Sequence, residues 1–271
     1  MINKKTYARI LPLPLMLLAM LLPATAFSVD VAADEKKGLE IAVEVDLRDE
    51  GFTDSSASLE MILRNRHGET SERQLRNKTL EVADDGDKVI IIFDTPRDVK
   101  GTAFLSFTHK LEADDQWLYL PALKRVKRIA SRNKAGPFMG SEFAYEDISS
   151  QEVEKYTYRH IKDETFDDRD HFIIERDPVD SKSGYKRQRV WIDKAEYRIW
   201  KIDFYDRKDS LLKTLIYDDY NQYVKKFWRA NIMEMTNHQT GKSTRLNWKN
   251  FSFQNGFSEK AFTKNALKKA R

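Results

Sequence analysis

The stretch QWLYLPALKRVKRIASRNKAGPFMGSEFAY, residues 116–145, decides how the rest of the chain is interpreted. It begins with a short apolar segment, Trp117–Leu120, which predicts a strand that Pro121 ends because proline lacks a backbone donor. A run of cations follows, and the turn Gly136–Gly140 then returns apolar residues to the chain. An apolar strand, a cationic run and an apolar turn this close together suit a ligand with a hydrophobic tail and an anionic head.

The cationic run holds six basic residues in eleven positions, with Val126 and Ile129 between them and no acid. Such a segment can lie on an apolar surface with its charges turned outward. We predict that it docks on an anionic surface or on a partner, and a plain solvated face is the alternative. The predicted docking residues are Lys124, Arg125, Lys127, Arg128, Arg132 and Lys134.

Apolar residues on a turn flanked by Gly136 and Gly140 indicate a movable lid, because glycine permits large backbone changes and exposed apolar groups need a cover. On the preceding strand, alternation places Trp117 and Tyr119 on one face and Leu118 and Leu120 on the other. A plain hydrophobic core is the alternative for these strand residues. The residues predicted to line an apolar cavity and its lid are Trp117, Tyr119, Leu120, Leu123, Phe138, Met139, Phe143 and Tyr145.

The segment WLYLPALKRVKRIA of this stretch and the segment FMGSEFAYED, which ends two residues after the stretch, resemble the signature of the LolA-like family of periplasmic proteins, which are grouped with outer-membrane lipoprotein-sorting proteins. The segment DTPRDVKGTAFLSF, residues 94–107, resembles the element that precedes this signature in the family. The resemblance runs from about Leu39 to the C-terminus. It implies an open, incomplete antiparallel barrel with helices over its mouth, and a functional link to exporters of the resistance-nodulation-division (RND) type.

The first 26 residues are predicted to be a secretory signal peptide, which leaves one domain of residues 27–271 that is soluble in the periplasm. Three basic residues precede the apolar run Ile10–Leu22, and Ala24–Ala26 fits a cleavage site. The run is too short and too interrupted by proline to span a membrane. Removing this segment lowers the formal net charge from +4 to +1. A general attraction to nucleic acid is therefore not expected.

From Ser58 to Phe253 the chain is a succession of short apolar or alternating segments separated by turn residues. This pattern predicts an antiparallel sheet or barrel of about eleven strands. Curling such a sheet and covering it with helices would bury its long apolar face. Glu35–Asp49 alternates as a strand does, but its composition and the resemblance favour a helix. The predicted fold is mainly β with α, an open and incomplete antiparallel barrel of LolA/LolB type covered by helices.

No constellation of catalytic or metal-binding residues stands out in the sequence. The five histidines form no close pair and no HExxH motif, and Ser141 in MGSEF lacks the second glycine of a nucleophile elbow. The acidic residues between Asp163 and Asp170 lack the spacing of a calcium loop. We therefore predict a protein that is not an enzyme and that holds no metal and no cofactor, with an esterase as the weakest alternative.

These features together predict a periplasmic carrier that holds a lipid or a lipoprotein acyl chain in an apolar cavity. It would serve outer-membrane lipoprotein sorting, or lipid transport with an RND-type exporter. A transient contact with a membrane surface through the cationic run fits such a carrier. The alternative is a non-enzymatic periplasmic adaptor that binds an RND-type transporter or an envelope complex and carries no lipid.

Overall fold

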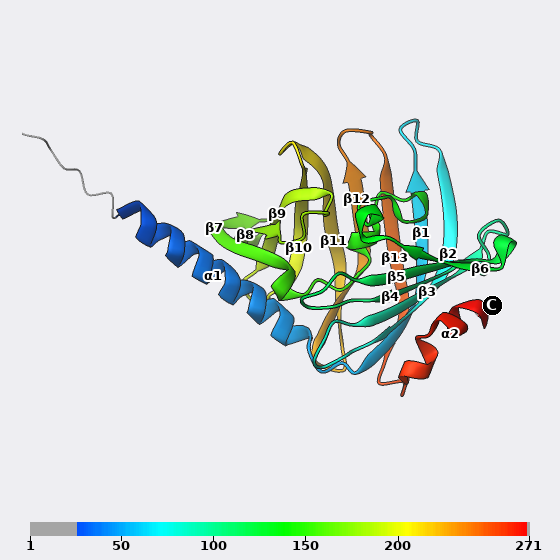
Figure 1. Cartoon of the computed structure of the whole chain (residues 1–271). Coiled ribbons are helices and arrows are strands. Elements are labelled where there is room, and N and C mark those ends of the chain that lie inside the picture. The colour runs from blue at the N-terminus through cyan, green and yellow to red at the C-terminus, as the bar shows by residue number, and fades with distance from the viewer. Residues whose placement is uncertain (1–25, 270–271) are drawn as a thin grey trace, which may run out of the picture.

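The computed structural model describes residues 26–269, which form one antiparallel sheet, two α-helices and six short 3₁₀ turns (Figure 1). The helices are α1 (Ala26–Asp49) and α2 (Lys264–Lys269). The strands are β1 (Asp54–Arg64), β2 (Thr70–Leu80), β3 (Lys88–Thr95), β4 (Ala103–Phe107), β5 (Asp115–Leu120), β6 (Arg125–Ile129), β7 (Tyr156–Phe166), β8 (Arg169–Pro178), β9 (Tyr185–Asp193), β10 (Ile199–Asp206), β11 (Leu211–Tyr223), β12 (Phe227–Asn237) and β13 (Ser243–Phe253). The 3₁₀ turns are η1 (Pro121–Leu123), η2 (Ser131–Asn133), η3 (Phe138–Gly140), η4 (Tyr145–Asp147), η5 (Val153–Lys155) and η6 (Glu259–Ala261).

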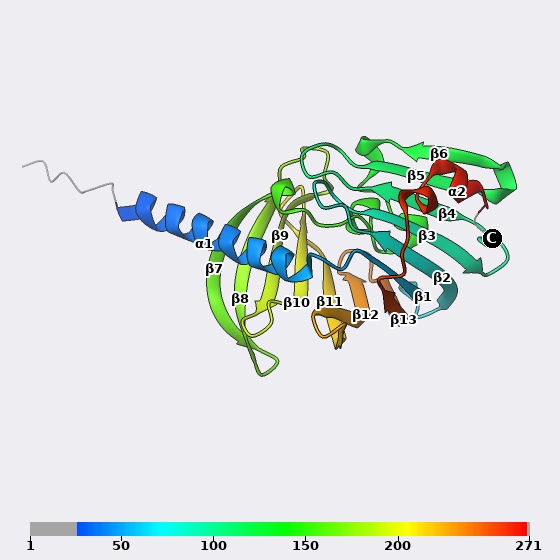
Figure 2. The same ribbon diagram turned by 90° about the horizontal axis from the view of Figure 1, so that it is seen from below.

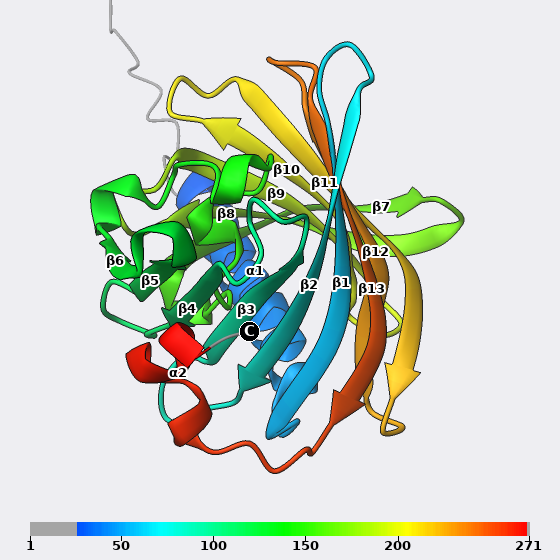
Figure 3. The same ribbon diagram turned by 90° about the vertical axis from the view of Figure 1, so that its right-hand side faces the viewer.

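The strands are hydrogen-bonded in the order β6-β5-β4-β3-β2-β1-β13-β12-β11-β10-β9-β8-β7, so nearly all neighbours are joined by hairpins. The end strands β6 and β7 are not paired with each other in the described part of the chain. The sheet therefore curls without closing, as Figure 3 shows from one side. The predicted open antiparallel barrel covered by helices is confirmed. It has thirteen strands rather than about eleven, and β6 lies inside the cationic run, where the sequence did not indicate a strand.

The helix predicted over Glu35–Asp49 is also confirmed, and it begins earlier, at Ala26. α1 lies against β7 and β8 and reaches β12 (Figure 2). Gly38 permits the close crossing, because a Cβ at this position would lie only 2.7 Å from the backbone of β7. Ile41 and Ala42, one turn further on, are buried in the same cluster as the concave face of the sheet. The predicted signal peptide lies outside the described residues, apart from its last residue.

Hydrophobic clusters form on both faces of the sheet. The smaller one lies on the convex face of β3, β4 and β5, where Phe262 and Leu267 of the C-terminal segment cover Ile90, Leu105 and Trp117. The larger one occupies the concave face and receives side chains from strands along most of the sheet as well as from α1. The concave side is therefore the interior in which a ligand site would be sought.

Candidate functional site

The concave face of the sheet is the candidate site. Every second residue of a strand faces this side, so the wall is built from the alternating apolar positions of the sequence. The C-terminal half of α1 and the segment between β6 and β7 lie against the concave face, whereas the start of α1 projects beyond β7 (Figure 1 and Figure 3). Large side chains of the wall that are almost fully buried are Met61, Leu75, Phe93, Phe104, Ile174, Ile192 and Met235.

The turn that was predicted to be a lid lies inside the curl. We call residues 136–148, which contain it, the plug segment. Phe138 is 0% exposed and Phe143 is 1% exposed. The ring centroid of Phe138 lies 6.0 Å from that of Phe93 on β3 and 5.2 Å from that of Phe104 on β4. These distances are those of packed aromatic pairs, so Phe138 is a core residue.

Buried polar contacts tie the plug segment to the wall. Lys213 Nζ on β11 lies 2.7 Å from Asp147 Oδ2 and donates to the carbonyl oxygen of Glu142 at 2.9 Å. The Tyr185 hydroxyl on β9 donates to both carboxylate oxygens of Asp147, at 2.9 and 3.0 Å. Burial raises the pKa of Tyr185 well above its usual value, and the charge of Asp147 raises it further. Because removing either charge would leave the other one buried and unpaired, the ion pair holds the segment in place.

The turn itself is also fixed. Arg73 Nη1 on β2 donates to the carbonyl oxygen of Met139 at 2.6 Å, and Met139 packs against the concave cluster. Gly140 has φ +81°, so its freedom serves a tight turn. Phe138 is buried in the interior and Met139 is partly buried against the same cluster, so the turn is closed in this structure, and its movement as a lid stays a prediction. Their part in retaining a ligand stays a prediction.

Two further predicted lining residues lie on the other side of the sheet. Trp117 and Tyr119 belong to the convex cluster beneath the C-terminal segment, and Lys264 Nζ lies 4.5 Å from the centroid of the Trp117 ring. Because alternation separates them from Leu118 on the same strand, they cannot line one cavity together with Phe138. The prediction that they line one apolar cavity together with Phe138 is therefore wrong.

The remaining predicted lining residues are divided as well. Leu120, Phe143 and Tyr145 all pack in the concave cluster, as predicted for residues of one interior. Leu123 is 52% exposed on the turn after β5 and is not part of that cluster. Of the eight predicted residues, the structure thus brings together Leu120, Phe138, Met139, Phe143 and Tyr145.

An aromatic cavity of about 320 Å³ lies where the C-terminal end of α1 meets β10, β11 and β12. Burial raises the pKa values of Tyr217 and Tyr220, so these phenols stay neutral at physiological pH. Sequence reasoning missed this cavity because its residues are spread over separate elements. Its apolar and aromatic lining is Val45, Tyr197, Ile199, Tyr217, Tyr220 and Trp228, and its charged lining is Arg48, Asp49, Glu196, Arg198, Lys226 and Arg229.

A second cavity, of about 710 Å³, lies between the N-terminal half of α1 and strands β7 and β8. Val31 and Leu39 of the helix face Tyr156 and Tyr158 of β7 across it. Both helix residues are about half exposed, at 45% and 46%. Apolar surface is therefore left uncovered on the helix side of this cavity.

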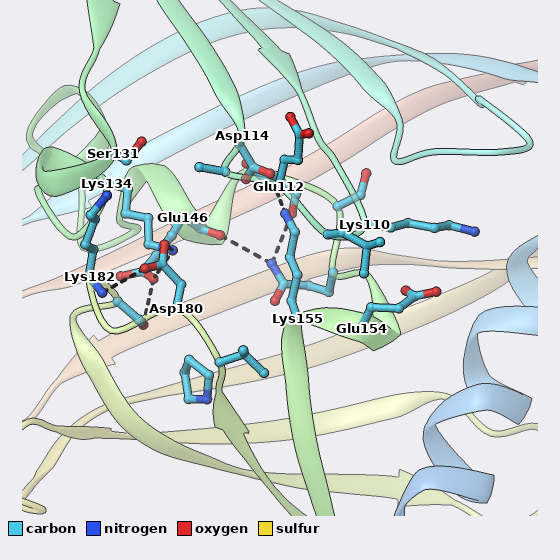
Figure 4. Close-up of a pocket in the computed structure, with 18 of the residues that line it drawn as sticks. Lys110, Glu112, Asp114, Ser131, Lys134, Glu146, Glu154, Lys155, Asp180 and Lys182 are labelled. Carbon is cyan, nitrogen blue, oxygen red and sulfur yellow. Dashed lines mark hydrogen bonds and ion pairs between the residues drawn. The ribbon is translucent and has the colours of Figure 1, made fainter.

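A third cavity, of about 310 Å³, is polar and lies between the loop after β4 and the loop after β8 (Figure 4). Lys134 Nζ lies 2.7 Å from Asp180 Oδ2, and Lys155 is paired with Asp114. Glu146 accepts hydrogen bonds from Ser183 and Gly184, and burial raises its pKa. The charges of this cavity largely neutralise one another, so it lacks a site for a single strong charge.

The predicted docking residues do not form one surface. Lys134 belongs to the polar cavity, and Arg128 is paired with Asp115 on the convex side of β5. The other four, Lys124, Arg125, Lys127 and Arg132, are exposed and make no ion pair with a described residue. Charges on an edge strand such as β6 also hinder pairing with another chain, which is a second physical reason for their presence.

Two buried carboxyl groups lie near the polar cavity. The pKa of Asp87 is raised to about 7, mainly by burial, and that of Glu152 is raised to about 7 by burial together with the charge of Asp87. Ser150 Oγ donates to Asp87 Oδ2 at 3.3 Å. Sequence reasoning missed this pair because Asp87 is one of several acids in a turn. Each carboxyl is therefore poised to change its charge near neutral pH.

The described residues contain no group of three or more histidine, cysteine, aspartate and glutamate side chains that could hold a metal ion. Within residues 26–269, neither helix combines the length and apolar character needed to cross a membrane.

An open antiparallel barrel with a helix across its apolar concave face defines a carrier-like fold. The sequence model of a family described as an uncharacterized protein matches residues 85–269. The chain is similar to a candidate outer membrane lipoprotein-sorting protein domain from Vibrio parahaemolyticus, with 61% identity and a TM-score of 0.85 over 86% of this chain and 99% of that chain. It is also similar to a DUF1329 family protein from Desulfovibrio piger, with 30% identity and a TM-score of 0.82 over the same shares.

A LolA superfamily protein from Nitrosomonas europaea shares the fold, with 18% identity and a TM-score of 0.68 over 84% of this chain and 98% of that chain. No curated protein matches the chain. The chain belongs to the same family as the lipoprotein-sorting domain and the DUF1329 protein, and it has the LolA-like fold that its central stretch indicated.

Proposed function

We propose that the protein is a periplasmic carrier that binds a lipid or a lipoprotein acyl chain in the concave interior. The observation that carries the proposal is an apolar concave wall covered by separate segments, α1 and the plug segment, with cavities along it. A free chain of about sixteen carbons would cost on the order of 12 kcal/mol to hold in water, at about 0.8 kcal/mol per methylene. Covers that can be displaced would let such a chain enter and leave.

The decisive experiment is mass spectrometry of organic extracts from the natively purified mature protein. A carrier should release lipid in a reproducible ratio, and protein that was unfolded, stripped and refolded should rebind the same lipid. If neither preparation holds lipid, and a neutral fluorescent probe such as N-phenyl-1-naphthylamine finds no site, the carrier proposal fails.

The location and the partner are parts of the same proposal. Periplasmic location is supported by the signal-like N-terminal sequence and by the similarity to a lipoprotein-sorting domain. N-terminal sequencing should find a mature chain that starts near Phe27, whereas a membrane-bound protein that starts at Met1 would contradict it. An RND-type exporter as donor rests on the family resemblance, and cross-linking in membranes that contain the exporter would test it.

The plug segment favours a second candidate, an adaptor that carries no lipid. Phe138 and Phe143 already occupy the space that a ligand tail would use, and the Lys213–Asp147 pair holds the segment there. In an adaptor these residues would be permanent core. The extraction experiment separates the two functions, because an adaptor should yield no lipid while still binding its partner.

A further inference from the structure

A buried arginine without an acidic partner lies on the concave face. Arg176 is on β8 and alternates with Phe172 and Ile174, which both pack in the concave cluster. It is only 7% exposed. Its register partners are Tyr158 on β7 and Gln188 on β9, so it lies within the wall and not at its edge.

The contacts of Arg176 leave most of its donors unused. Nε donates to Gln188 Oε1 at 2.8 Å, which is its only hydrogen bond to a described residue. The guanidinium carbon lies 4.5 Å from the centroid of the Tyr156 ring. No carboxylate of the described chain lies within 4 Å, whereas the other deeply buried cation of this face, Lys213, is paired with Asp147.

A buried charge of this kind is unfavourable as far as the interior does not replace the hydration that the charge loses. The two nitrogens of Arg176 without a hydrogen bond keep some access to solvent, because neither is among the fully buried, unpartnered polar atoms of the described residues. Arginine stays charged under all ordinary conditions, so it cannot avoid this cost by losing its proton. Stacking on Tyr156 offsets part of the cost. A bound oxyanion would offset much more, because a planar guanidinium can donate two parallel hydrogen bonds to a carboxylate or a phosphate.

The surroundings of Arg176 fit an amphiphile. Tyr156, on which it stacks, lines both the 710 Å³ cavity under α1 and the polar 310 Å³ cavity. Tyr217 lines the aromatic cavity, and burial raises its pKa. The positive charge of Arg176 opposes this rise. Arg176 thus stacks on a residue that lines two of the cavities, but it is not itself among the lining residues of the three cavities.

We propose that Arg176 binds the carboxylate or phosphate head group of a single-chain amphiphile whose tail lies on the apolar concave face. This inference rests on the proposed carrier function and narrows its ligand class. The acyl chains of a lipoprotein are joined through neutral ester and amide groups, which offer no oxyanion. The site therefore selects a free anionic lipid over a lipoprotein.

The test compares ligands that differ only in their head group. Oleate, oleyl phosphate and oleyl alcohol would each displace N-phenyl-1-naphthylamine from the full mature protein at pH 8. The charged hydrogen bonds should make the preferred anion bind about tenfold to a hundredfold more tightly than the alcohol. The affinity of each anion is divided by that of the alcohol, and the anion with the larger ratio identifies the preferred head group.

Arg176→Met should abolish this ratio while leaving the affinity for the alcohol nearly unchanged, and Arg176→Lys should keep part of the ratio. Arg187→Met is the matched control, because Arg187 also stacks on a tyrosine: its guanidinium carbon lies 3.5 Å from the centroid of the Tyr205 ring. Arg187 differs in lying on the convex face, where it is paired with Glu175. A ratio near one in wild type, or an unchanged ratio in Arg176→Met, would overturn the inference and leave the carrier function standing. Failure of wild type to bind any of the three ligands would overturn both.

Discussion

Replacing Phe138 with alanine tests whether the plug segment belongs to the folded core. The side chain is fully buried against the rings of Phe93 and Phe104. Phenylalanine-to-alanine changes in such positions cost about 3–5 kcal/mol, through lost burial and the cavity that remains. In a domain of this size each kcal/mol lowers the melting temperature by roughly 2–4 °C, so we expect a decrease of about 10 °C.

Urea unfolding followed by tryptophan fluorescence and thermal unfolding followed by circular dichroism would both measure this loss. Leu123→Ala is the control, because Leu123, in the turn after β5, is 52% exposed and should change stability by at most about 0.5 kcal/mol. If both Phe138→Ala and Leu123→Ala unfold at the melting temperature of wild type, the plug segment is a loosely attached cover and its assignment to the core is refuted.

Three further predictions concern charge. Lys213→Met should destabilise the fold by about 3–5 kcal/mol in urea unfolding, because it leaves the buried carboxylate of Asp147 without its partner. Adding Asp147→Asn to this variant should restore much of the lost stability. If the two substitutions instead lower the free energy of unfolding additively, the two residues are not coupled. The raised pKa values of Asp87 and Glu152 mean that the folded state holds their protons more tightly than the unfolded state does, so their contribution to stability is full below about pH 4 and is lost as the pH rises through about 7. Asp87→Asn, which cannot ionise, should therefore gain stability relative to wild type as the pH rises over that range. A difference in melting temperature between the variant and wild type that stays constant with pH would refute this. Arg125→Glu should weaken binding to anionic vesicles at low salt and not at high salt, in a sedimentation assay, since an exposed cation contributes about 1 kcal/mol there; salt-independent binding would count against an electrostatic contact.

The alternation of apolar and polar residues predicted the strands of the sheet well and the segments that connect them less well. Alternation placed Leu118 and Trp117 on opposite faces of β5, and the structure confirms this. It could not say which face was the interior, because α2 covers the convex side with residues more than a hundred positions away. The strand β6 was missed because cations dominate Arg125–Ile129, and strand patterns are recognised by apolar residues.

The candidate site was harder to predict because its residues meet only in three dimensions. Phe138 looked exposed because glycines flank it, yet those glycines shape a tight turn that inserts the ring into the core. The tyrosines of the aromatic cavity come from the turn before β10 and from β11, and no local motif joins them. Arg176 did carry a signal, because it continues the inward alternation of Phe172 and Ile174. A cation at an inward position of a strand therefore indicates a buried charge that needs a partner, which for Lys213 is Asp147.

For the proposed carrier, the plug segment and a ligand tail compete for one interior. Expelling Phe138 and Phe143 would cost about 1.5–3 kcal/mol each in lost burial. Opening the Lys213–Asp147 pair would add about 3–5 kcal/mol if its charges stayed buried, and less if water reached them. The sum, about 6–11 kcal/mol, is close to the 12 kcal/mol or so that burial of a sixteen-carbon chain returns. Exchange would then be nearly balanced, with the added hydrogen bonds at Arg176 favouring an anionic ligand. A near balance of this kind lets a donor load the protein and an acceptor unload it, whereas an empty, preformed cavity would hold the lipid too tightly to release.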